Sequence, residues 1–311
     1  MRLISVITPC YNEEENVEKL YQSVRDVFLE LNNYRYEHIF IDNASEDKTV
    51  DILKRIAGKD KNVKIIVNLR NFGHIRSPYH ALLQARGDAV IGMAADFQDP
   101  PPLIKDFIKK WEEGFKIVIG RKINSEENPF MFGLRRLYYN FIQKCSQTRQ
   151  IKNFTGFGLY DKKFIDILKQ LNEPYPYFRG LIAELGFEIA EIEYFQPGRK
   201  KGKTKNNFYT LYDMAILGFV SYSKVPLRVA TFIGIITAII SFIVALLYFV
   251  YKIIFWDSFS VGMAPLVIGL FFFSSIQLFF LGIIGEYIGA IYTQVKNRPL
   301  VIEKERINFD N

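Results

Sequence analysis

Several features that would assign a protein quickly to a class are scarce or absent from this sequence. Only two cysteines occur, Cys10 and Cys145, a number typical of reduced thiols in a cytosolic domain and not of a disulfide framework. The first apolar run, residues 3–8, is short and is followed closely by Glu13, so no signal peptide is predicted. No nucleic-acid-binding motif and no internal repeat is present. We therefore expect the amino-terminal part to stay in the cytosol without a nucleic-acid partner.

Charge is missing from two long stretches near the carboxyl end. Residues 229–251 and 261–285 contain no Asp, Glu, Lys or Arg. A helix of about 20 apolar residues crosses the roughly 30 Å hydrocarbon core of a bilayer, so we predict two transmembrane helices at about 229–253 and 262–290. Basic residues flank this pair on its outer sides, namely Lys224, Arg228, Lys296, Arg298, Lys304 and Arg306. The turn around Trp256 holds no Lys or Arg beyond Lys252. The positive-inside rule then predicts a multi-pass membrane protein with both termini cytoplasmic.

The remaining charge is moderately basic. Lys and Arg number 40 against 33 Asp and Glu, a formal net charge of +7. In a chain with two predicted spans, this excess favours an anionic leaflet or phosphate-bearing ligands as partners.

The first half alternates short apolar runs with amphipathic segments. Strands are predicted at residues 3–8, 38–42, 63–68, 89–94 and 116–120, and helices at 13–31, 48–57, 75–85 and 102–113. This alternation predicts an α/β domain with a mostly parallel sheet. Asn12 and Ser45, each followed by acidic residues, are predicted helix N-caps. Residues 153–161 are predicted to be a loop entering a short helix.

All five predicted strands end in polar or charged residues. The exits are Pro9–Glu13, residues 42–45, residues 70–73, residues 95–99 and Arg121 with Lys122. Ligands bind at the carboxyl ends of parallel strands, so these exits predict one site along one edge of the sheet.

Asp96 is the candidate metal ligand at that edge. A carboxylate after an apolar strand can hold Mg²⁺ or Mn²⁺ through oxygen, with the diphosphate of a donor completing the shell. The alternative for Asp96 and for Asp99 is that the carboxylate caps the helix that begins near Pro101.

Particular motifs then add a family resemblance. The segments SVITPCYNEEENV, IDNASEDKT, RNFG, AADFQDPP and GKTK resemble those of family 2 glycosyltransferases with the GT-A fold, a Rossmann-like domain. With the two spans and the ending LGIIGEYIGAIYTQVKNRP, nearly the whole chain resembles the membrane-anchored polyprenyl-phosphate glycosyltransferases. These include the bactoprenol glucosyltransferase and dolichyl-phosphate mannose synthase types, and the resemblance to the bacterial type implies a bacterial inner membrane.

The resemblance implies roles for particular residues. It implies that Pro9, Tyr11, Glu13 and Asp42 contact the nucleotide, and that Asp96 and Gln98 bind the metal and diphosphate. Arg121 and Arg135 or Arg136 would receive the acceptor phosphate, and Lys205 would reach the phosphates from a basic loop. For Lys200, Lys201 and Lys203, attraction to anionic headgroups is the alternative.

Three departures from the family pattern are visible. Ala94 stands where the family usually has the first acid of Asp-x-Asp, and Asp42-Asn43 stands where it usually has two acids. The loop that often reads Thr-Gly-Asp-Phe-Arg is Thr-Gly-Phe-Gly-Leu at residues 155–159, which places Phe157 at the acid. A phosphate monoester is mostly a dianion at neutral pH, so a phosphate acceptor needs no general base, whereas a hydroxyl does. The missing acid therefore favours a lipid phosphate acceptor.

These observations predict a GT-A domain over 1–205, an amphipathic linker over 206–227, the two helices within 228–295, and a cytosolic tail over 296–311. The predicted reaction is inverting transfer of a hexosyl group from a nucleotide sugar, UDP-linked as in UDP-glucose, to polyprenyl phosphate. Two alternatives remain open. One is transfer to a glycan or lipid hydroxyl, with Asp99 or Asp161 as base, and the other is a non-catalytic homologue that binds lipid phosphate or nucleotide. A two-helix anchor favours self-association, so a homo-oligomer such as a tetramer is expected.

Overall fold

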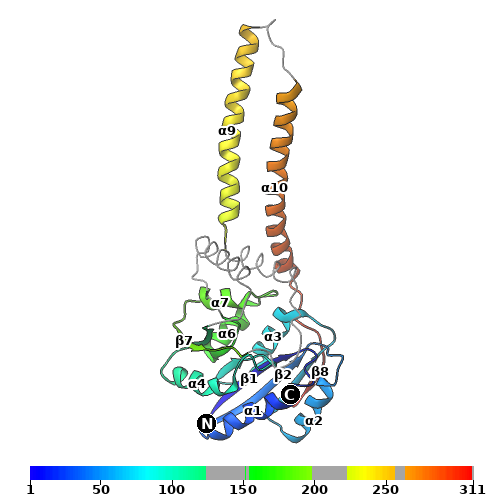
Figure 1. Ribbon diagram of the computed structural model, residues 1–311, viewed down its shortest axis with the longest axis vertical. Helices are drawn as coiled ribbons and strands as arrows, with labels where there is room; N and C mark the ends of the chain where they lie inside the picture. The colour runs from blue at the N-terminus through cyan, green and yellow to red at the C-terminus, as the bar shows by residue number, and fades with distance from the viewer. Residues whose placement is uncertain (124–150, 152–153, 198–222, 256–262, 310–311) are drawn as a thin grey trace.

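The computed structural model describes residues 1–123, 151, 154–197, 223–255 and 263–309, which form one eight-stranded sheet, its flanking helices and two long apolar helices (Figure 1). The strand order is β7-β5-β6-β4-β1-β2-β3-β8. The strands are β1 (Arg2–Cys10), β2 (Tyr34–Asp42), β3 (Val63–Asn68), β4 (Ala89–Gly92), β5 (Ile117–Lys122), β6 (Gly158–Asp161), β7 (Ile189–Tyr194) and β8 (Glu303–Ile307). Only β6 and β8 run antiparallel to their neighbours, so the predicted mostly parallel α/β sheet is confirmed.

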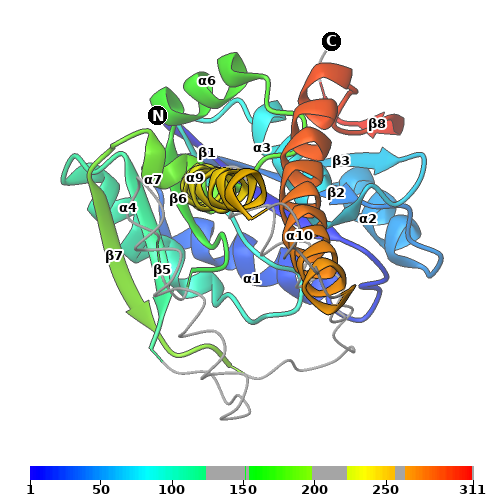
Figure 2. The same ribbon diagram turned by 90° about the horizontal axis from the view of Figure 1, so that it is seen from above.

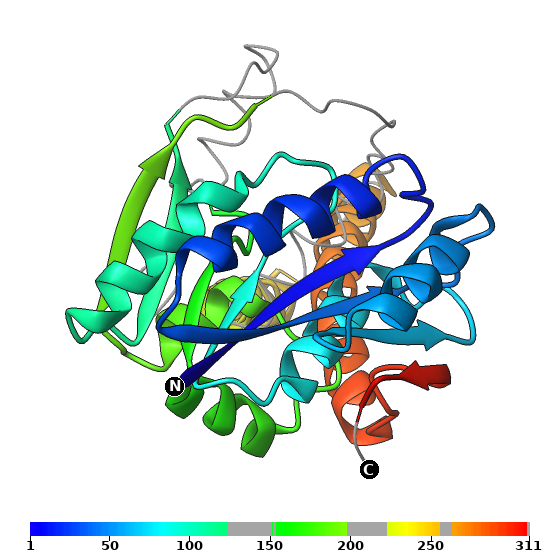
Figure 3. The same cartoon turned by 90° about the horizontal axis from the view of Figure 1, so that it is seen from below.

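Helices cover both faces of this sheet. The domain helices are α1 (Val17–Glu30), α2 (Thr49–Lys59), α3 (Gly73–Gln84), the 3₁₀ turn η1 (Pro101–Leu103), α4 (Ile104–Glu112), α6 (Lys162–Leu171) and α7 (Phe178–Glu184). Apolar residues of α1, α2 and α4 form one core cluster, and those of α3, α6 and α7 form the other. Figure 3 shows α1 and the α3–α6 pair on opposite sides of the strands.

The period of a strand explains why two cores form. Successive side chains point to opposite faces, so Ile65 joins the first cluster and Ile66 the second, both fully buried. The same alternation recurs on β4, where Ile91 belongs to the first cluster and Val90 to the second. Because such a strand is buried on both faces, its sequence is a continuous apolar run, as in β3 and β4.

Three strands were not predicted from the sequence. The predicted loop at 153–161 was wrong in part, because residues 158–161 form β6 between β4 and β5. β7 pairs with β5 at one edge, and β8 comes from the predicted tail and pairs with β3 at the other. The sheet therefore includes residues on both sides of the apolar helices.

The two apolar helices extend away from the sheet side by side. They are α9 (Val225–Ile254) and α10 (Met263–Lys296), and both are long and apolar enough to cross a membrane. Their large apolar side chains are exposed, as at Phe242 and Phe271. Seen from above, α9 stands over α7 and β6, and α10 over α3 (Figure 2). The predicted linker lies almost wholly outside the described residues, as do Trp256 and Cys145.

His38 makes the stability of this domain depend on pH. Its ring is fully buried, contacts Thr8 Oγ1 through Nε2 at 3.0 Å and stacks on Phe40. Burial lowers the pKa of His38 from 6.5 to about 3. Below pH 6.5 the unfolded chain therefore binds a proton that the folded chain does not, and stability falls as pH falls. From pH 6.5 to pH 5 we expect a loss of about 2 kcal/mol, at roughly 1.4 kcal/mol per pH unit.

The measurement is the free energy of unfolding against pH for the wild-type chain and for His38→Gln. The difference between the two curves should grow below pH 6.5. A constant difference would show that His38 is not the titrating group.

Candidate active site

The five predicted strand exits do meet at one edge. β1 to β5 are mutually parallel across the sheet, so their carboxyl ends lie on the same side. β8 runs back along β3 with Glu303 beside Asn68, the last residue of β3. Since α10 ends at Lys296, just before β8, the apolar helices join the domain at this same edge.

Reciprocal hydrogen bonds connect the loops that follow β1 and β2. The backbone N–H of Asn12 donates to Ser45 Oγ at 2.8 Å, and Asn12 Oδ1 accepts from the backbone N–H of Glu46 at 2.8 Å. Helices α1 and α2 begin only at Val17 and Thr49, so the predicted N-caps at Asn12 and Ser45 were wrong. Both side chains join two loops and so fix the shape of the site.

Asp42 lies at the centre of this connection. Its carboxylate accepts from the backbone N–H of Ser45 at 2.9 Å and from the Ser45 hydroxyl, and the residue is fully buried. Burial raises the pKa of Asp42, although the Ser45 hydrogen bonds act in the opposite direction. Around it, Pro9, Tyr11 and Glu13 are half-buried on the same edge. The nucleotide contacts implied for these four residues stay predictions.

Asn43 connects the loops after β2 and β3, a role that the sequence did not reveal. Its Nδ2 donates to Asn71 Oδ1 at 2.8 Å and to Gly73 O at 3.2 Å. Its Oδ1 accepts from Phe72 N at 2.9 Å and from Asn68 Nδ2 at 3.1 Å. An amide both donates and accepts, whereas a carboxylate only accepts. This explains why Asn, and not a second acid, follows Asp42.

Replacing Asn43 with Asp should therefore lower stability by about 2 kcal/mol, because two donated hydrogen bonds are lost and a nearly buried charge faces acceptor oxygens. The exposed Asn32→Asp has the same charge change without these contacts and is the matched control. Thermal unfolding of the two variants tests the role, and equal midpoints would contradict it.

The loop after β4 presents Asp96. Asp96 is 9% exposed, and its Oδ1 accepts from the backbone N–H of Gln98 at 3.2 Å. Asp99 holds the loop in shape: its carboxylate accepts hydrogen bonds from Ala94 N at 2.9 Å and from the Tyr194 hydroxyl at 3.1 Å. Burial raises the pKa of Asp99 to about 6. η1 has no side-chain cap, so the capping alternative was wrong for both carboxylates.

Three of these loops contain a non-glycine residue in the left-handed region. They are Asn12, Ala44 and Phe97, with φ of 56°, 63° and 61°. Each such residue costs of order 1 kcal/mol or more and persists where the surroundings enforce it, which is common at ligand sites. Their positions after β1, β2 and β4 support the assignment of the site to this edge.

Phe157, which stands where the family has an acid, lies in the core. It is 1% exposed and packs between Phe107 and Tyr194, with ring centroids 4.8 Å and 5.5 Å away. The preceding Gly156 has φ of 103°, and its carbonyl oxygen lies beside Gly92 at the end of β4. The match between Phe157 and the acid of the family stays a prediction.

The basic residues predicted at the acceptor are only partly described. Arg121 lies at the end of β5 and forms ion pairs with Glu191, at 2.8 Å, and with Glu193. Its contact with an acceptor phosphate stays a prediction. Arg135, Arg136 and Lys205 lie outside the described residues, as do Lys200, Lys201 and Lys203.

Asp161 lies at the opposite edge of the sheet. It ends β6 beside Ala89, the first residue of β4, and accepts hydrogen bonds from Trp111 Nε1 at 2.7 Å and Lys163 N at 2.9 Å. Asp161 therefore cannot serve as a base at the strand exits.

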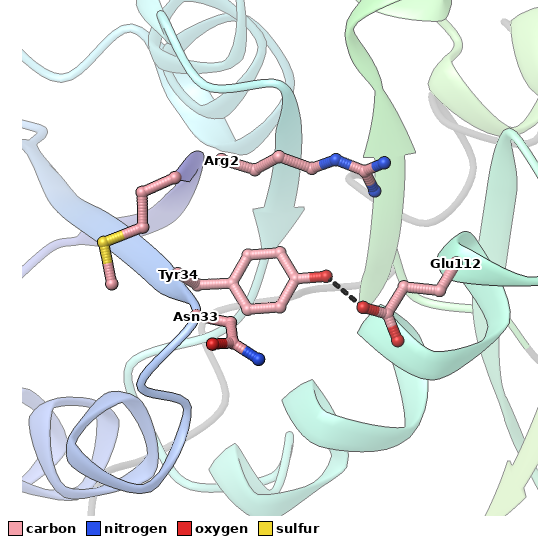
Figure 4. A pocket seen from close by; sticks show the side chains of 5 residues that line it. Arg2, Asn33, Tyr34 and Glu112 are labelled. Atoms are coloured by element: carbon pink, nitrogen blue, oxygen red, sulfur yellow. Dashed lines mark hydrogen bonds between the residues drawn. The ribbon is translucent and has the colours of Figure 1, made fainter.

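A shallow hollow of about 440 Å³ also lies at that opposite edge, lined by Met1, Arg2, Asn33, Tyr34 and Glu112 (Figure 4). The Tyr34 hydroxyl donates to Glu112, which closes one side of the hollow. Arg2 and Tyr34 begin β1 and β2, so this hollow is remote from the polar exits and is not the candidate active site.

A mostly parallel, mixed sheet with a polar site at its carboxyl edge and an Asp-bearing loop after β4 defines a GT-A-type domain. The model of the family "Glycosyl transferase family 2" matches residues 5–166, more than half of the chain. The chain belongs to this family and is a glycosyltransferase.

Its curated relatives are similar over nearly their whole length. An uncharacterised glycosyltransferase of Bacillus subtilis, YkcC, is 33% identical over 99% of this chain and 95% of the relative. The bactoprenol glucosyl transferase of Shigella phage SfII is 33% identical over 97% of each chain. The putative glycosyltransferase CsbB of B. subtilis is 35% identical over 97% of this chain and 92% of the relative.

Among solved structures, the chain is similar to glucosyl-3-phosphoglycerate synthase from Mycobacterium tuberculosis in complex with Mn²⁺, UDP and phosphoglyceric acid. The identity is 17%, the TM-score is 0.48, and the match covers 70% of this chain and 76% of the other.

Proposed function

We propose that this chain transfers a hexosyl group from a nucleotide sugar, UDP-linked such as UDP-glucose, to a polyprenyl phosphate at the cytoplasmic face of the membrane. The observation that carries the proposal is the position of α9 and α10. They leave the domain at the edge where the strand exits meet, so helices embedded in a bilayer would hold that edge close to the headgroups. Similarity to bactoprenol glucosyl transferases over nearly the full chain supports the lipid acceptor.

The residues of the β4 loop fit a divalent cation that is shared with the donor. Asp96 and Gln98 offer oxygen ligands, and the described residues contain no group of three His, Cys, Asp or Glu side chains that could hold an ion alone. Mg²⁺ or Mn²⁺ commonly binds one or two protein oxygens plus substrate phosphates. When bound, the ion would neutralise charge that develops on the diphosphate.

The proposed step is an inverting displacement. An oxygen of the lipid phosphate forms a bond to the anomeric carbon while the bond from that carbon to the nucleoside diphosphate breaks and its electron pair leaves with the diphosphate. The attacking oxygen carries no proton at neutral pH, so no general base is required. Asp99 is held by Ala94 and Tyr194, Asp161 lies at the far edge, and position 157 is phenylalanine. These facts support a phosphate acceptor over a hydroxyl.

The test uses the purified full chain in detergent with undecaprenyl phosphate, Mg²⁺ or Mn²⁺, and a panel of UDP-, GDP- and dTDP-sugars. Mass spectrometry should detect a new glycosyl phosphoprenol that disappears when EDTA is added. Transfer only to an added glycan or lipid hydroxyl would refute the acceptor. Nucleotide-sugar binding without any product would favour the non-catalytic alternative.

A further inference from the structure

Arg76 occupies an unusual position at the membrane-side edge of the sheet. It lies in the first turns of α3, and its Nη2 donates to the carbonyl oxygen of Pro299 at 2.8 Å. Its Nε is buried, and within the described part of the chain it has no hydrogen-bond partner. A buried guanidinium N–H without an acceptor is costly, so this group is poised to donate to an additional ligand.

Two further arginines lie beside Arg76. Arg298 directly precedes Pro299, and Arg70 follows Leu69, whose backbone N–H donates to Ile302 O at 2.9 Å. Burial lowers the pKa of Arg76, and the positive charges of Arg70 and Arg298 lower it further. Like charges are therefore brought together here by the chain segment that connects α10 to β8.

Carboxylates elsewhere in the domain neutralise comparable arginines. Arg55 pairs with Glu18 at 2.8 Å, and Arg121 pairs with Glu191 at the same distance. Among the residues that the structure describes, no carboxylate forms an ion pair with Arg70, Arg76 or Arg298. Glu173, which is close to α10, instead accepts a hydrogen bond from Gln294. Within the described residues, the charge of the cluster is therefore not balanced by an ion pair.

The location of the cluster indicates which anion it meets. Arg298 lies two residues beyond the end of α10, where a membrane-embedded helix would emerge among headgroups. Arginine binds phosphate oxygens through its planar fork, with charge-assisted hydrogen bonds. We propose that Arg70, Arg76 and Arg298 form a binding site for the phosphate group of a membrane lipid. The source is either the prenyl phosphate acceptor, which rests on the proposed function, or an anionic phospholipid.

The test measures lipid binding by the full-length protein without any sugar donor. Two probes are used: farnesyl phosphate in detergent, and phosphatidylglycerol offered against phosphatidylcholine in mixed nanodiscs. Arg298→Gln and Arg70→Gln are the primary variants, since neither side chain makes an inter-element hydrogen bond that the structure shows. Arg76→Gln is the secondary variant, because Arg76 also donates a hydrogen bond to Pro299 O and its loss could disturb the local structure. Lys19→Gln, an exposed cation on α1, is the matched control.

Each arginine variant should weaken binding of one probe about tenfold, equivalent to roughly 1.4 kcal/mol, and should reduce its salt dependence. Weaker farnesyl phosphate binding would identify the acceptor phosphate, and lost preference for phosphatidylglycerol alone would identify the surrounding phospholipid. Unchanged binding of both probes, or an equal loss in Lys19→Gln, would overturn the proposal. Because no donor is present, failure here is distinct from failure of sugar transfer.

Discussion

Replacing Asp96 with alanine should lower the rate of sugar transfer by about 100-fold or more. The loop after β4 contains two carboxylates, Asp96 and Asp99. Asp99 accepts hydrogen bonds from Ala94 N and the Tyr194 hydroxyl, which leaves Asp96 as the candidate metal ligand. Removing a group that stabilises charge on a leaving diphosphate commonly costs 10²–10³ in rate. The measurement is the initial rate of glycosyl phosphoprenol formation at saturating donor and metal.

Asp106→Asn, an exposed carboxylate on α4, is the control and should keep wild-type activity. Thermal unfolding of Asp96→Ala, measured alongside, separates a loss of metal binding from a loss of folded protein. Full activity in Asp96→Ala would exclude the assigned metal role even if the glycosyltransferase activity itself were confirmed.

Phe157→Asp should have the largest effect on stability, a loss of about 4 kcal/mol or more. The ring is packed between Phe107 and Tyr194, and the Tyr194 hydroxyl already donates to Asp99. An aspartate at 157 would lose this packing and place an unpaired charge in the core near another carboxylate. Chemical denaturation of the detergent-purified protein measures the change.

Phe157→Leu keeps an apolar side chain and should cost only about 1.5 kcal/mol. If Phe157→Asp were as stable as Phe157→Leu, position 157 would have to be open to solvent, and the core position of Phe157 would be wrong.

The same residue shows where sequence reasoning succeeded and where it failed. The motif Thr155-Gly156-Phe157 was recognised as a departure from the family pattern, but the sequence alone did not show that the Phe157 ring is buried in the core. Phe157 contacts Phe107 on α4, and no local pattern records that contact.

The parallel strands and their polar exits were predictable because buried strands have a strong apolar signal and are followed by turns. The N-caps at Asn12 and Ser45 were predicted wrongly because the same side chains that cap helices also bond to backbone in another loop. Asn12 accepts from Glu46, 34 residues away in sequence. Such pairings depend on how two loops meet in space, which their separate sequences do not specify.

The order of synthesis gives β8 a further consequence. This strand closes the β3 edge of the sheet, yet its residues are translated after both apolar helices. Until then β3 is an uncovered edge strand, a template on which another extended chain can assemble. Leu69 and His80 gain their partners last, since the Leu69 N–H donates to Ile302 O and Glu303 contacts His80 at 2.7 Å. Completion of the sheet therefore has to follow synthesis of both apolar helices, and a chain that ends before residue 303 would leave the β3 edge open to pairing with another strand.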